Sequence, residues 1–257
     1  MKKFMLSLLL AACALTLAAQ TEYKASLFGC MSDGVTLNTR SIQTAINTIS
    51  SQGGGMLHFY VGRYLTGTVF LKDNVTIVLH EGATLVGVPS IYDYVAPSNA
   101  PKGIIVAEGQ KNIGVVGSTP ERELNTNVVG SGIIQGQGAL LTENAQAQLA
   151  KGYLAKTSGQ ISPALISFSG CTGVKVTGLM LQGAAGDVVA LKGCTDVEVA
   201  RLLVDSRETL GCNGIVADGC KNLTLTDNFI HVSGSAIQAL QSKGVKVKNN
   251  KTPKGKL

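Results

Sequence analysis

The second half of the chain repeats one short pattern, a polar turn followed by alternating apolar residues: Cys171-Thr172-Gly173-Val174-Lys175-Val176, Cys194-Thr195-Asp196-Val197-Glu198-Val199, Cys220-Lys221-Asn222-Leu223-Thr224-Leu225 and Ser242-Lys243-Gly244-Val245-Lys246-Val247. The first apolar residue of each copy recurs at spacings of 23, 26 and 22 residues. A period in the twenties with short strands indicates one coil of a parallel β-helix per repeat. The strands of a β-sandwich do not explain such equal spacings, and the leucine and asparagine pattern of a leucine-rich repeat is absent. The sequence therefore predicts an all-β, single-stranded, right-handed parallel β-helix.

Two earlier stretches extend the pattern towards the N-terminus: Lys72-Asp73-Asn74-Val75-Thr76-Ile77 and Lys111-Asn112-Ile113-Gly114-Val115. The composition agrees, since the 257 residues are 45% hydrophobic and only 15% charged, and 31 of them are glycine. That much apolar residue excludes a disordered chain. Many glycines with few charges are typical of a β protein with many turns. We expect one domain, residues 20–257.

An amphipathic stretch lies over residues 40–51, because Ile42, Ala45, Ile46 and Ile49 fall on one helical face. Three consecutive glycines follow it and end the helix. A solenoid needs its end coils covered to stay soluble. We therefore predict a helix that caps the N-terminal end of the β-helix core.

The first residues have the features of a secretory signal. Lys2 and Lys3 precede an apolar run from Phe4 to Leu17, which is too short to span a membrane. No other stretch of the sequence is apolar over a sufficient length. We predict a signal peptide over residues 1–19 and export to the periplasm or the cell exterior.

Lipidation is a second interpretation of the same segment. Leu10-Ala11-Ala12-Cys13 resembles the lipobox of a bacterial lipoprotein, which would attach the protein to the outer membrane through Cys13. Apolar residues continue to Ala19, and this favours simple export.

Three cysteines, Cys171, Cys194 and Cys220, hold the same position in successive repeats, so we expect them to stack as a column. Buried thiols pack as small hydrophobes, although a disulfide between coils is open for an exported protein. The five cysteines beyond the signal, whose pairing stays open, are Cys30, Cys171, Cys194, Cys212 and Cys220. No metal site or cofactor is expected, because no Cys-x-x-Cys or paired-histidine spacing is present.

The three histidines, His58, His80 and His231, lie far apart in the sequence. His58 and His80 alternate with apolar residues, and we predict exposed strand positions for both.

Four stretches carry a family resemblance: Phe28 to Thr39, Gly62-Arg63-Tyr64-Leu65-Thr66-Gly67, Glu81-Gly82-Ala83-Thr84-Leu85 and Gly130-Ser131-Gly132-Ile133-Ile134-Gln135-Gly136-Gln137-Gly138. They resemble the pectate-lyase-like superfamily and, within it, glycoside hydrolase family 28, the polygalacturonases and rhamnogalacturonases. The last stretch is similar to that family's Gly-x-Gly-x-Ile-Asp-Gly-x-Gly motif, with Gln135 in place of the Asp. The resemblance runs from about Leu27 to Val247. It implies a β-helix whose substrate class, and main partner, is the acidic plant polysaccharide pectin.

The resemblance also implies a catalytic column. Family members hydrolyse galacturonan with inversion, using carboxylates from an Asn-Thr-Asp and an Asp-Asp motif and a His and an Arg-x-Lys motif from later coils. The family's first Asp aligns with Asn213, and its Asp pair aligns with Gly234 and Ser235. Asp187 holds the matching position one coil earlier, and no His-Gly or Arg-x-Lys motif follows. Inversion needs an acid and a base roughly 6.5–9.5 Å apart. Amides and hydroxyls cannot fill those roles, so the inherited mechanism is not available.

A relocated site is the alternative. Asp187, Asp205 and Glu208 are its candidate catalytic carboxylates, and Arg207 is a candidate substrate-binding residue. The sequence places Asp205, Arg207 and Glu208 in one long turn near the family's cleft. Solvated polar residues of an exposed loop are the simpler interpretation of the same turn.

Lysines accumulate after Asp227, the last acidic residue. We take Lys243 and Lys246 as candidate residues for binding an acidic polysaccharide. Protection of a terminal strand edge explains the same lysines. Export and the scarcity of aromatic residues disfavour nucleic acid as the partner.

Two functions follow. The leading hypothesis is an exported pectin-hydrolase-like protein that acts on or binds pectic polysaccharide without the family's standard hydrolysis, in other words a pseudoenzyme. The alternative is an active polygalacturonase-type glycosidase with relocated carboxylates. A lyase is disfavoured, because the clustered carboxylates of a calcium site are absent.

Overall fold

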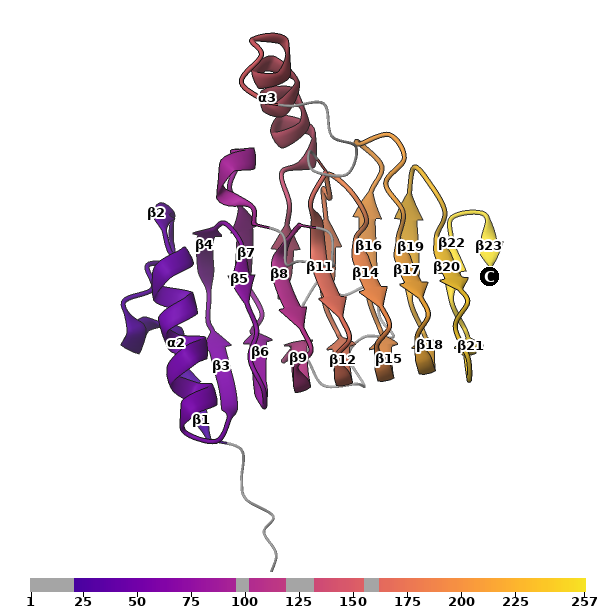
Figure 1. The fold of residues 1–257 in the computed structure, drawn as a ribbon, viewed down its shortest axis with the longest axis horizontal. Helices are drawn as coiled ribbons and strands as arrows, with labels where there is room; N and C mark the ends of the chain where they lie inside the picture. Colours follow the sequence, from indigo (N-terminus) through magenta and orange to yellow (C-terminus); the bar gives the residue numbers. More distant parts are fainter. Residues whose placement is uncertain (1–20, 96–101, 119–131, 155–161) are drawn as a thin grey trace, which may run out of the picture.

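The computed structural model describes residues 21–95, 102–118, 132–154 and 162–257 (Figure 1). The predicted signal peptide, with Cys13, lies outside the described residues. The described chain winds as a right-handed parallel β-helix in which successive coils add strands to three parallel sheets. The predicted fold class is confirmed.

The three sheets, named A, B and C, are described here in their spatial order. Sheet A consists of β1 (Glu22–Lys24), β3 (Gly55–Phe59), β6 (Val75–Leu79), β9 (Lys111–Gly117), β12 (Thr172–Thr177), β15 (Thr195–Ala200), β18 (Lys221–Thr226) and β21 (Lys246–Lys248). Sheet B consists of β2 (Asp33–Leu37), β4 (Gly62–Thr66), β7 (Ala83–Gly87), β10 (Ile133–Gln135), β13 (Met180–Gln182), β16 (Leu203–Ser206), β19 (Phe229–Val232), β22 (Lys251–Thr252) and β23 (Gly255–Lys256). Sheet C consists of β20 (Ile237–Leu240), β17 (Ile215–Asp218), β14 (Val189–Lys192), β11 (Ala164–Ser169), β8 (Gly103–Glu108) and β5 (Val69–Phe70).

Within a coil the chain passes from sheet A to sheet B to sheet C, as in β12, β13 and β14. Between β11 and β20 each turn from A to B and from C to A spans two residues, as at residues 178–179 and 193–194. The turns from B to C are longer, with residues 183–188 between β13 and β14 and residues 207–214 between β16 and β17. These B-to-C turns form one corner of the coil and carry the candidate site.

The repeated motif has a backbone reason. Its turn residue has a positive φ in every copy, at Asn74, Asn112, Gly173, Asp196, Asn222 and Gly244. Only glycine and, among other residues, chiefly asparagine and aspartate adopt this conformation at low cost. The Asn and Asp side chains at this position can also connect neighbouring coils. For example, Asn222 Nδ2 donates to Asp196 Oδ1 over 2.9 Å. The recurrence of Asn, Asp and Gly therefore sets the start of each sheet A strand.

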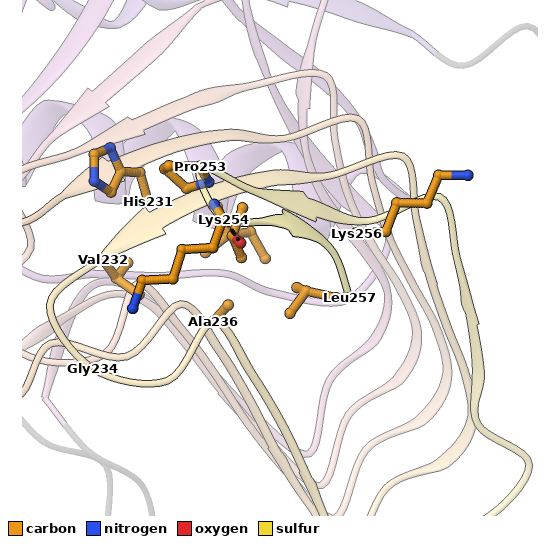
Figure 2. Close-up of a pocket in the computed structure, with 10 residues that line it drawn as sticks. His231, Val232, Gly234, Ala236, Pro253, Lys254, Lys256 and Leu257 are labelled. Atoms are coloured by element: carbon orange, nitrogen blue, oxygen red, sulfur yellow. Dashed lines mark hydrogen bonds between the residues drawn. The ribbon is translucent and has the colours of Figure 1, made fainter.

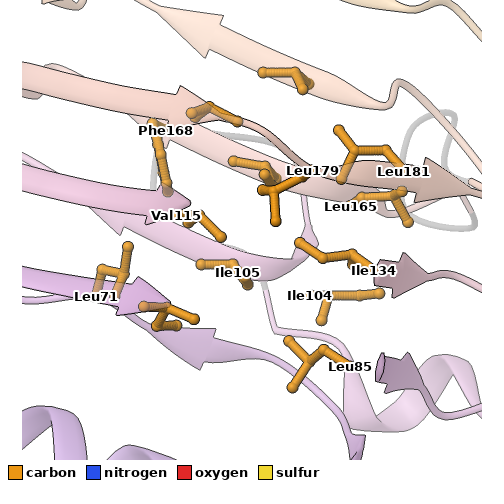
Figure 3. Close-up of a cluster of buried hydrophobic side chains, with 14 of the residues drawn as sticks. Leu71, Leu85, Ile104, Ile105, Val115, Ile134, Leu165, Phe168, Leu179 and Leu181 are labelled. Carbon is orange, nitrogen blue, oxygen red and sulfur yellow. The ribbon is translucent and has the colours of Figure 1, made fainter. Parts of the chain in front are cut away.

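Inward residues stack in registered rows and form one core (Figure 3). In sheet B the row passes through Leu85, Ile134, Leu181, Val204 and Ile230, all buried. Each fully buried side chain of this kind contributes about 1.5–3 kcal/mol relative to exposure. Because each coil buries its apolar side chains against the next, the stack is stable only as a whole.

The expected cysteine column is present. Cys171, Cys194 and Cys220 are fully buried at the corner between sheets C and A, and the five described cysteines are all free. Cys194 is hydrogen-bonded to both neighbours, and these bonds together with burial raise its pKa, so it stays a thiol. The column packs the corner, and the disulfide interpretation is not supported in the described residues.

The predicted helix is α2 (Thr39–Ser51), which lies at the N-terminal end and packs against β3, β5 and β6 (Figure 1). Its buried residues are the four predicted ones, Ile42, Ala45, Ile46 and Ile49. Its role as the cap of the core stays a prediction.

A second helix, α3 (Gly138–Ala150), was not predicted. It lies between β10 and β11 in the chain and contacts the short helix η2 (Ile91–Asp93). Asn144 Nδ2 donates to the Pro89 carbonyl over 2.8 Å and fastens it there. A further short helix, η1 (Ala25–Phe28), follows β1.

The prediction for His58 is wrong. Its side chain is only 7% exposed, because it packs beside His80 and Tyr60 on the outside of sheet A. His58 Nδ1 lies 2.8 Å from His80 Nε2, so one ring donates to the other. The His58 Nε2 atom is buried without a hydrogen-bond partner among the described residues.

We expect the free energy of unfolding to fall as the pH drops below about 6.5, the ordinary pKa of histidine. Burial lowers the pKa of His58 and of His80, and Glu22 offsets this only in part. The unfolded chain then binds more protons, so stability that is present above the ordinary pKa is lost on acidification. Urea unfolding across this range measures the slope.

Replacing both histidines with glutamine should flatten that slope, whereas Asn47→Gln on the exposed face of α2 should leave it in place. Hydrogen bonds from Thr36 and Val35 lower the pKa of the Asp33 carboxyl from its ordinary value of 3.8. Protonation of Asp33 therefore affects the free energy of unfolding only at a lower pH than the histidines do. An unchanged slope in the double variant would contradict the assignment.

Candidate functional site

Three residues predicted to share one column do meet at the corner between sheets B and C, two through their side chains and Ser235 through its backbone N–H. Asn213 Nδ2 donates to Asp187 Oδ1 over 2.9 Å. On the other side, Asn213 Oδ1 accepts from the Ser235 backbone N–H at 3.0 Å and from Gln238 Nε2 at 3.3 Å. The order Asp187, Asn213, Ser235 follows three successive coils. We call these three residues the turn column.

The backbone holds the turn column in register. The Val188 N–H donates to the Asn213 carbonyl over 2.8 Å, and the Gly214 N–H donates to the Ser235 carbonyl over 2.9 Å. Each strand of sheet C therefore starts one coil spacing above the last. Adjacent parallel strands lie about 4.8 Å apart, so side chains at this position touch directly.

Both polar atoms of the Asn213 amide are hydrogen-bonded in this network. Its Nδ2 faces the Asp187 carboxylate, and its Oδ1 faces two donors, so the amide orientation is set by the contacts. An amide neither supplies nor accepts a catalytic proton. An aspartate at this position would lose the donor to Asp187 and set two carboxylates side by side.

Gly234 is closed to a side chain. A Cβ atom there would lie 2.6 Å from Asn213 Oδ1 and 2.8 Å from the Cys212 carbonyl oxygen. Its φ lies outside the positive range, so the cost of a substitution is steric. The space that a side chain at Gly234 would occupy is thus filled by atoms of Asn213 and Cys212.

Cys212 offers no replacement nucleophile. Its side chain is buried next to the turn column. Burial, with the charge of Asp187 adding to it, raises the pKa of the Cys212 thiol to about 12. A thiol with this pKa carries almost no thiolate at neutral pH.

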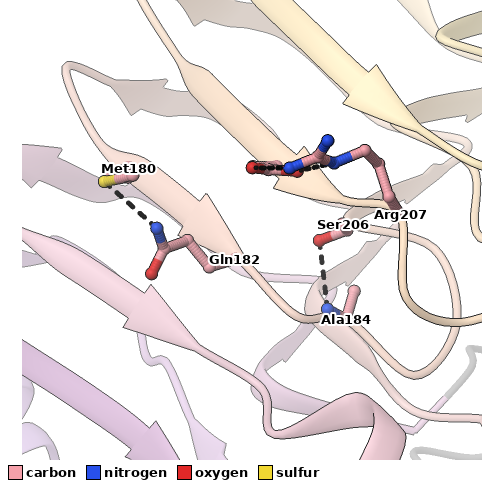
Figure 4. Close-up of polar contacts among 6 residues, drawn as sticks. Met180, Gln182, Ala184, Ser206 and Arg207 are labelled. Carbon is pink, nitrogen blue, oxygen red and sulfur yellow. Dashed lines mark hydrogen bonds and ion pairs between the residues drawn. The ribbon is translucent and has the colours of Figure 1, made fainter.

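Asp205 and Arg207 form a pair of their own. Asp205 lies in β16 and not in the following turn as the sequence suggested, and it pairs in register with Gln182 and His231 on sheet B. Arg207 Nε and Nη2 donate to the two Asp205 carboxylate oxygens over 2.8 and 3.0 Å (Figure 4). The guanidinium that we expected to bind substrate is therefore occupied by Asp205.

Glu208 follows in the turn and is exposed. Among the described residues no hydrogen bond or ion pair connects Glu208, Asp205 or Arg207 with the turn column. The structure therefore does not bring the predicted relocated carboxylates into contact with Asp187.

The lysines lie elsewhere. The backbone of Lys243 forms an isolated parallel β-bridge with that of Lys221 at the corner between sheets C and A. Lys246 lies in β21 and is in register with Thr224 of β18 on sheet A. Both are exposed. The length of sheet C separates this corner from the turn column, so these two lysines are not part of one site with it.

A pocket that the sequence analysis missed adjoins Gly234 (Figure 2). It encloses about 430 Å³ between β19 and the antiparallel β22–β23 pair. Its lining consists of Ile230, His231, Val232, Gly234, Ala236, Thr252, Pro253, Lys254, Lys256 and Leu257. The lysine run was visible in the sequence, but the hairpin that turns two of its members back onto the last coil was not.

Within the described part of the chain, no three His, Cys, Asp or Glu side chains gather closely enough to hold a metal ion. No helix of the described residues has both the length and the apolar character needed to cross a membrane.

Comparison with known proteins agrees with this architecture. The model of glycosyl hydrolases family 28 matches residues 105–256. The chain is 39% identical to a "putative glycosyl hydrolase" of Parabacteroides merdae with a TM-score of 0.81, and the match covers 91% of this chain and 99% of that one. The family 28 exopolygalacturonase of Yersinia enterocolitica shares the fold, with a TM-score of 0.74 and 20% identity over 91% of this chain and 49% of its own.

Two curated relatives are longer. A probable polygalacturonase of Vitis vinifera is 27% identical over 84% of this chain and 43% of its own length. An exo-poly-α-D-galacturonosidase of Dickeya chrysanthemi is 25% identical over 87% of this chain and 39% of its own. The chain thus spans about two fifths of the curated relatives that it matches. On the family match and the Parabacteroides likeness together, the chain belongs to glycosyl hydrolases family 28.

Proposed function

We propose that this protein binds pectic polysaccharide along the turn column and does not hydrolyse it by the family's standard mechanism. The observation that carries the proposal is the Asn213 amide, fixed between Asp187 and Ser235 where the resemblance implies the first catalytic aspartate. The turn column then holds one carboxylate, and inversion needs two.

The substrate class rests on the relatives, whose names include polygalacturonase and exo-poly-α-D-galacturonosidase. Because one fold can host many functions, the proposal takes the substrate class of these relatives without taking their chemistry. Binding without turnover is the expected behaviour.

A paired assay tests this proposal. Release of reducing sugar and equilibrium binding are measured on the same panel, polygalacturonate, methyl-esterified pectin and a neutral glucan. We expect binding to polygalacturonate with no sugar release above the buffer blank. Sugar release at the rate of an ordinary family member would contradict the proposal.

An active glycosidase with relocated carboxylates is the second candidate function. One observation favours it, namely that Asp187 keeps a carboxylate in the turn column and that Asn213 holds this carboxylate in place. Its partner would be Asp205 or Glu208. If the wild-type protein releases sugar and Asp187→Asn abolishes the release, this second function is correct.

Restoring aspartates should recover little activity. We expect Asn213→Asp with Ser235→Asp to stay below about one thousandth of a normal family rate, because catalytic groups that act as a unit return little when only some are present. Gly234 is left unchanged in this variant, because any side chain there collides with Asn213 and Cys212. Reducing-sugar release measures the outcome.

Circular dichroism and the thermal midpoint show that the double variant is folded, and Asn47→Asp on the exposed face of α2 serves as the matched control. A rate close to that of an active polygalacturonase would refute the account of a lost site.

We also propose that the protein is exported, with residues 1–19 removed as a signal peptide. The support is the Lys2-Lys3 pair followed by the apolar run. Intact mass of the mature protein gives the cleavage point. A mass that includes acyl chains on Cys13 would instead establish the lipoprotein form.

A further inference from the structure

Asn213 is followed by glycine, and Asn213-Gly214 is the one Asn-Gly dipeptide of the 257-residue sequence. An asparagine before glycine is labile in water. The glycine nitrogen has no neighbouring Cβ atom to hinder it, so it can reach the side-chain carbonyl carbon and displace the amide. Gly214 directly precedes β17, and Asn213 belongs to the turn column. The labile amide is therefore the one that connects the coils at this corner.

Packing between coils requires the glycine. A Cβ atom at Gly214 would collide with the Ala236 carbonyl oxygen and would lie 2.6 Å from Ile230 Cγ2. Both of these atoms belong to the next coil, and Gly214 is buried. The stack thus keeps a labile dipeptide in the turn column.

The folded turn column restrains both reacting groups. The Gly214 N–H donates to the Ser235 carbonyl over 2.9 Å, so this nitrogen is hydrogen-bonded to the next coil. Asn213 Nδ2 donates to Asp187 Oδ1 in the preceding coil. Asn213 Oδ1 accepts from the Ser235 N–H and from Gln238 Nε2 in the following coil. Attack of the Gly214 nitrogen on Asn213 Cγ requires that these hydrogen bonds break first.

We propose that Asn213 is a self-modification site, which converts to a carboxylate when the turn column opens and stays an amide while the column is closed. The Gly214 nitrogen bonds to Asn213 Cγ, the Cγ–Nδ2 bond breaks, and ammonia leaves with the proton of the Gly214 N–H. Water then opens the resulting succinimide ring. Cleavage at Cγ gives aspartate, and cleavage at the backbone carbonyl carbon gives isoaspartate. The net reaction consumes one water and releases one ammonia.

Neither product restores the closed turn column. Aspartate puts a second carboxylate oxygen where Nδ2 donated to Asp187, and like charges in contact repel. Isoaspartate lengthens the backbone directly before β17 and disturbs the start of that strand. Conversion therefore records irreversibly that the turn column was open. The inference does not depend on the binding of polysaccharide.

The test compares the full chain in neutral buffer with the same chain in urea that unfolds it, and peptide mass analysis gives the fraction of acid at each asparagine. Asn222 is the matched control. Its Nδ2 also donates to an aspartate of the preceding coil, Asp196, over 2.9 Å, but Leu223 follows it. In urea Asn213 should convert while Asn222 stays an amide. In buffer conversion of Asn213 should be slower on the order of a hundredfold, because several hydrogen bonds restrain it.

Two variants isolate the restraint from the dipeptide. Asp187→Ala removes the acceptor of Asn213 Nδ2 and should speed conversion in buffer about tenfold, with no change in urea. Asp196→Gly releases Asn222 in the same way, with a residue that accepts the positive φ of Asp196, and Asn222 should stay an amide. Circular dichroism shows whether the variants are folded. Gln238→Ala, which removes one donor to Asn213 Oδ1, takes the place of Asp187→Ala if that variant does not fold.

Two results would overturn the proposal. If Asn213 converts no faster than Asn222 in urea, Asn213 is not a modification site. If Asn213 converts as fast in buffer as in urea, the turn column does not restrain the reaction. Binding to polygalacturonate is measured separately, so either result leaves the proposed function standing.

Discussion

Gly132→Ala should lower the free energy of unfolding by about 3 kcal/mol, the upper end of the usual range for overpacking. A Cβ atom at Gly132 would lie 2.0 Å from the Leu79 Cβ and 2.7 Å from the Leu79 carbonyl oxygen. Both atoms belong to the preceding coil, where the Leu79 carbonyl accepts from Ser118. Neither can move without opening the stack, because the Gly132 carbonyl also accepts from Met180 in the next coil.

Thermal unfolding measures this, and for a chain of this size we expect the midpoint to fall on the order of 10 °C. Gly109→Ala is the matched control. Nothing lies within 4 Å of a Cβ atom there, and φ is +65°, so only the conformational cost of about 1 kcal/mol applies. Equal losses in the two variants would show that the close approach of coils at Gly132 is not what matters.

Asn228→Ala should cost about 3 kcal/mol as well, by leaving buried polar groups without partners. Asn228 Oδ1 accepts from the Leu202 N–H over 3.0 Å, and its Nδ2 donates to the Val199 carbonyl over 3.1 Å. The same Nδ2 donates to Asn250 Oδ1 over 2.8 Å. One side chain thus connects three successive coils inside the turn between sheets A and B.

Urea unfolding measures the loss, with Asn47→Ala as the control, because Asn47 is exposed on α2 and receives only a hydrogen bond from Gln43. We expect the control to change stability by less than about 0.5 kcal/mol. If Asn228→Ala changes the free energy of unfolding only slightly, water replaces the amide at no cost. The hydrogen bonds of Asn228 to Leu202, Val199 and Asn250 then do not hold the coils together.

The sequence predicted the fold because local rules and stacking agree at each repeat. The Asn, Asp and Gly of the motif are residues that accept positive φ, and the alternating valines and leucines that follow face one core. The position of the cysteine column followed from the same periodicity. The helix α2 was predicted for the same reason, since its apolar residues recur at a regular helical spacing.

Elements without periodicity were missed. The α3 segment has no clear apolar face, so nothing in its pattern separates it from a loop. His58 was assigned to the surface from strand alternation alone. His58 is buried by contact with His80, which lies one coil away, and with Tyr60, which directly follows the end of the same strand.

For the candidate site too, the repeat predicted which residues share a position, and the contacts of their side chains were not predicted. Sequence alignment of the coils determined that Asp187, Asn213 and Ser235 share one column, because a fixed repeat puts equivalent positions above one another. Only the tertiary structure decided what their atoms do, namely that Asn213 is held between its two neighbours and that no side chain fits at Gly234.

By itself, then, the sequence determined the β-helix, its register and the single carboxylate at the repeat position shared by Asp187, Asn213 and Ser235, since these depend on which residue occupies each repeat position. The tertiary structure alone decided that Arg207 is neutralised by Asp205 and that Lys254 folds back beside Gly234. Side-chain pairing and pocket formation depend on distances between chain segments that share no repeat, and periodicity carries no information about those distances.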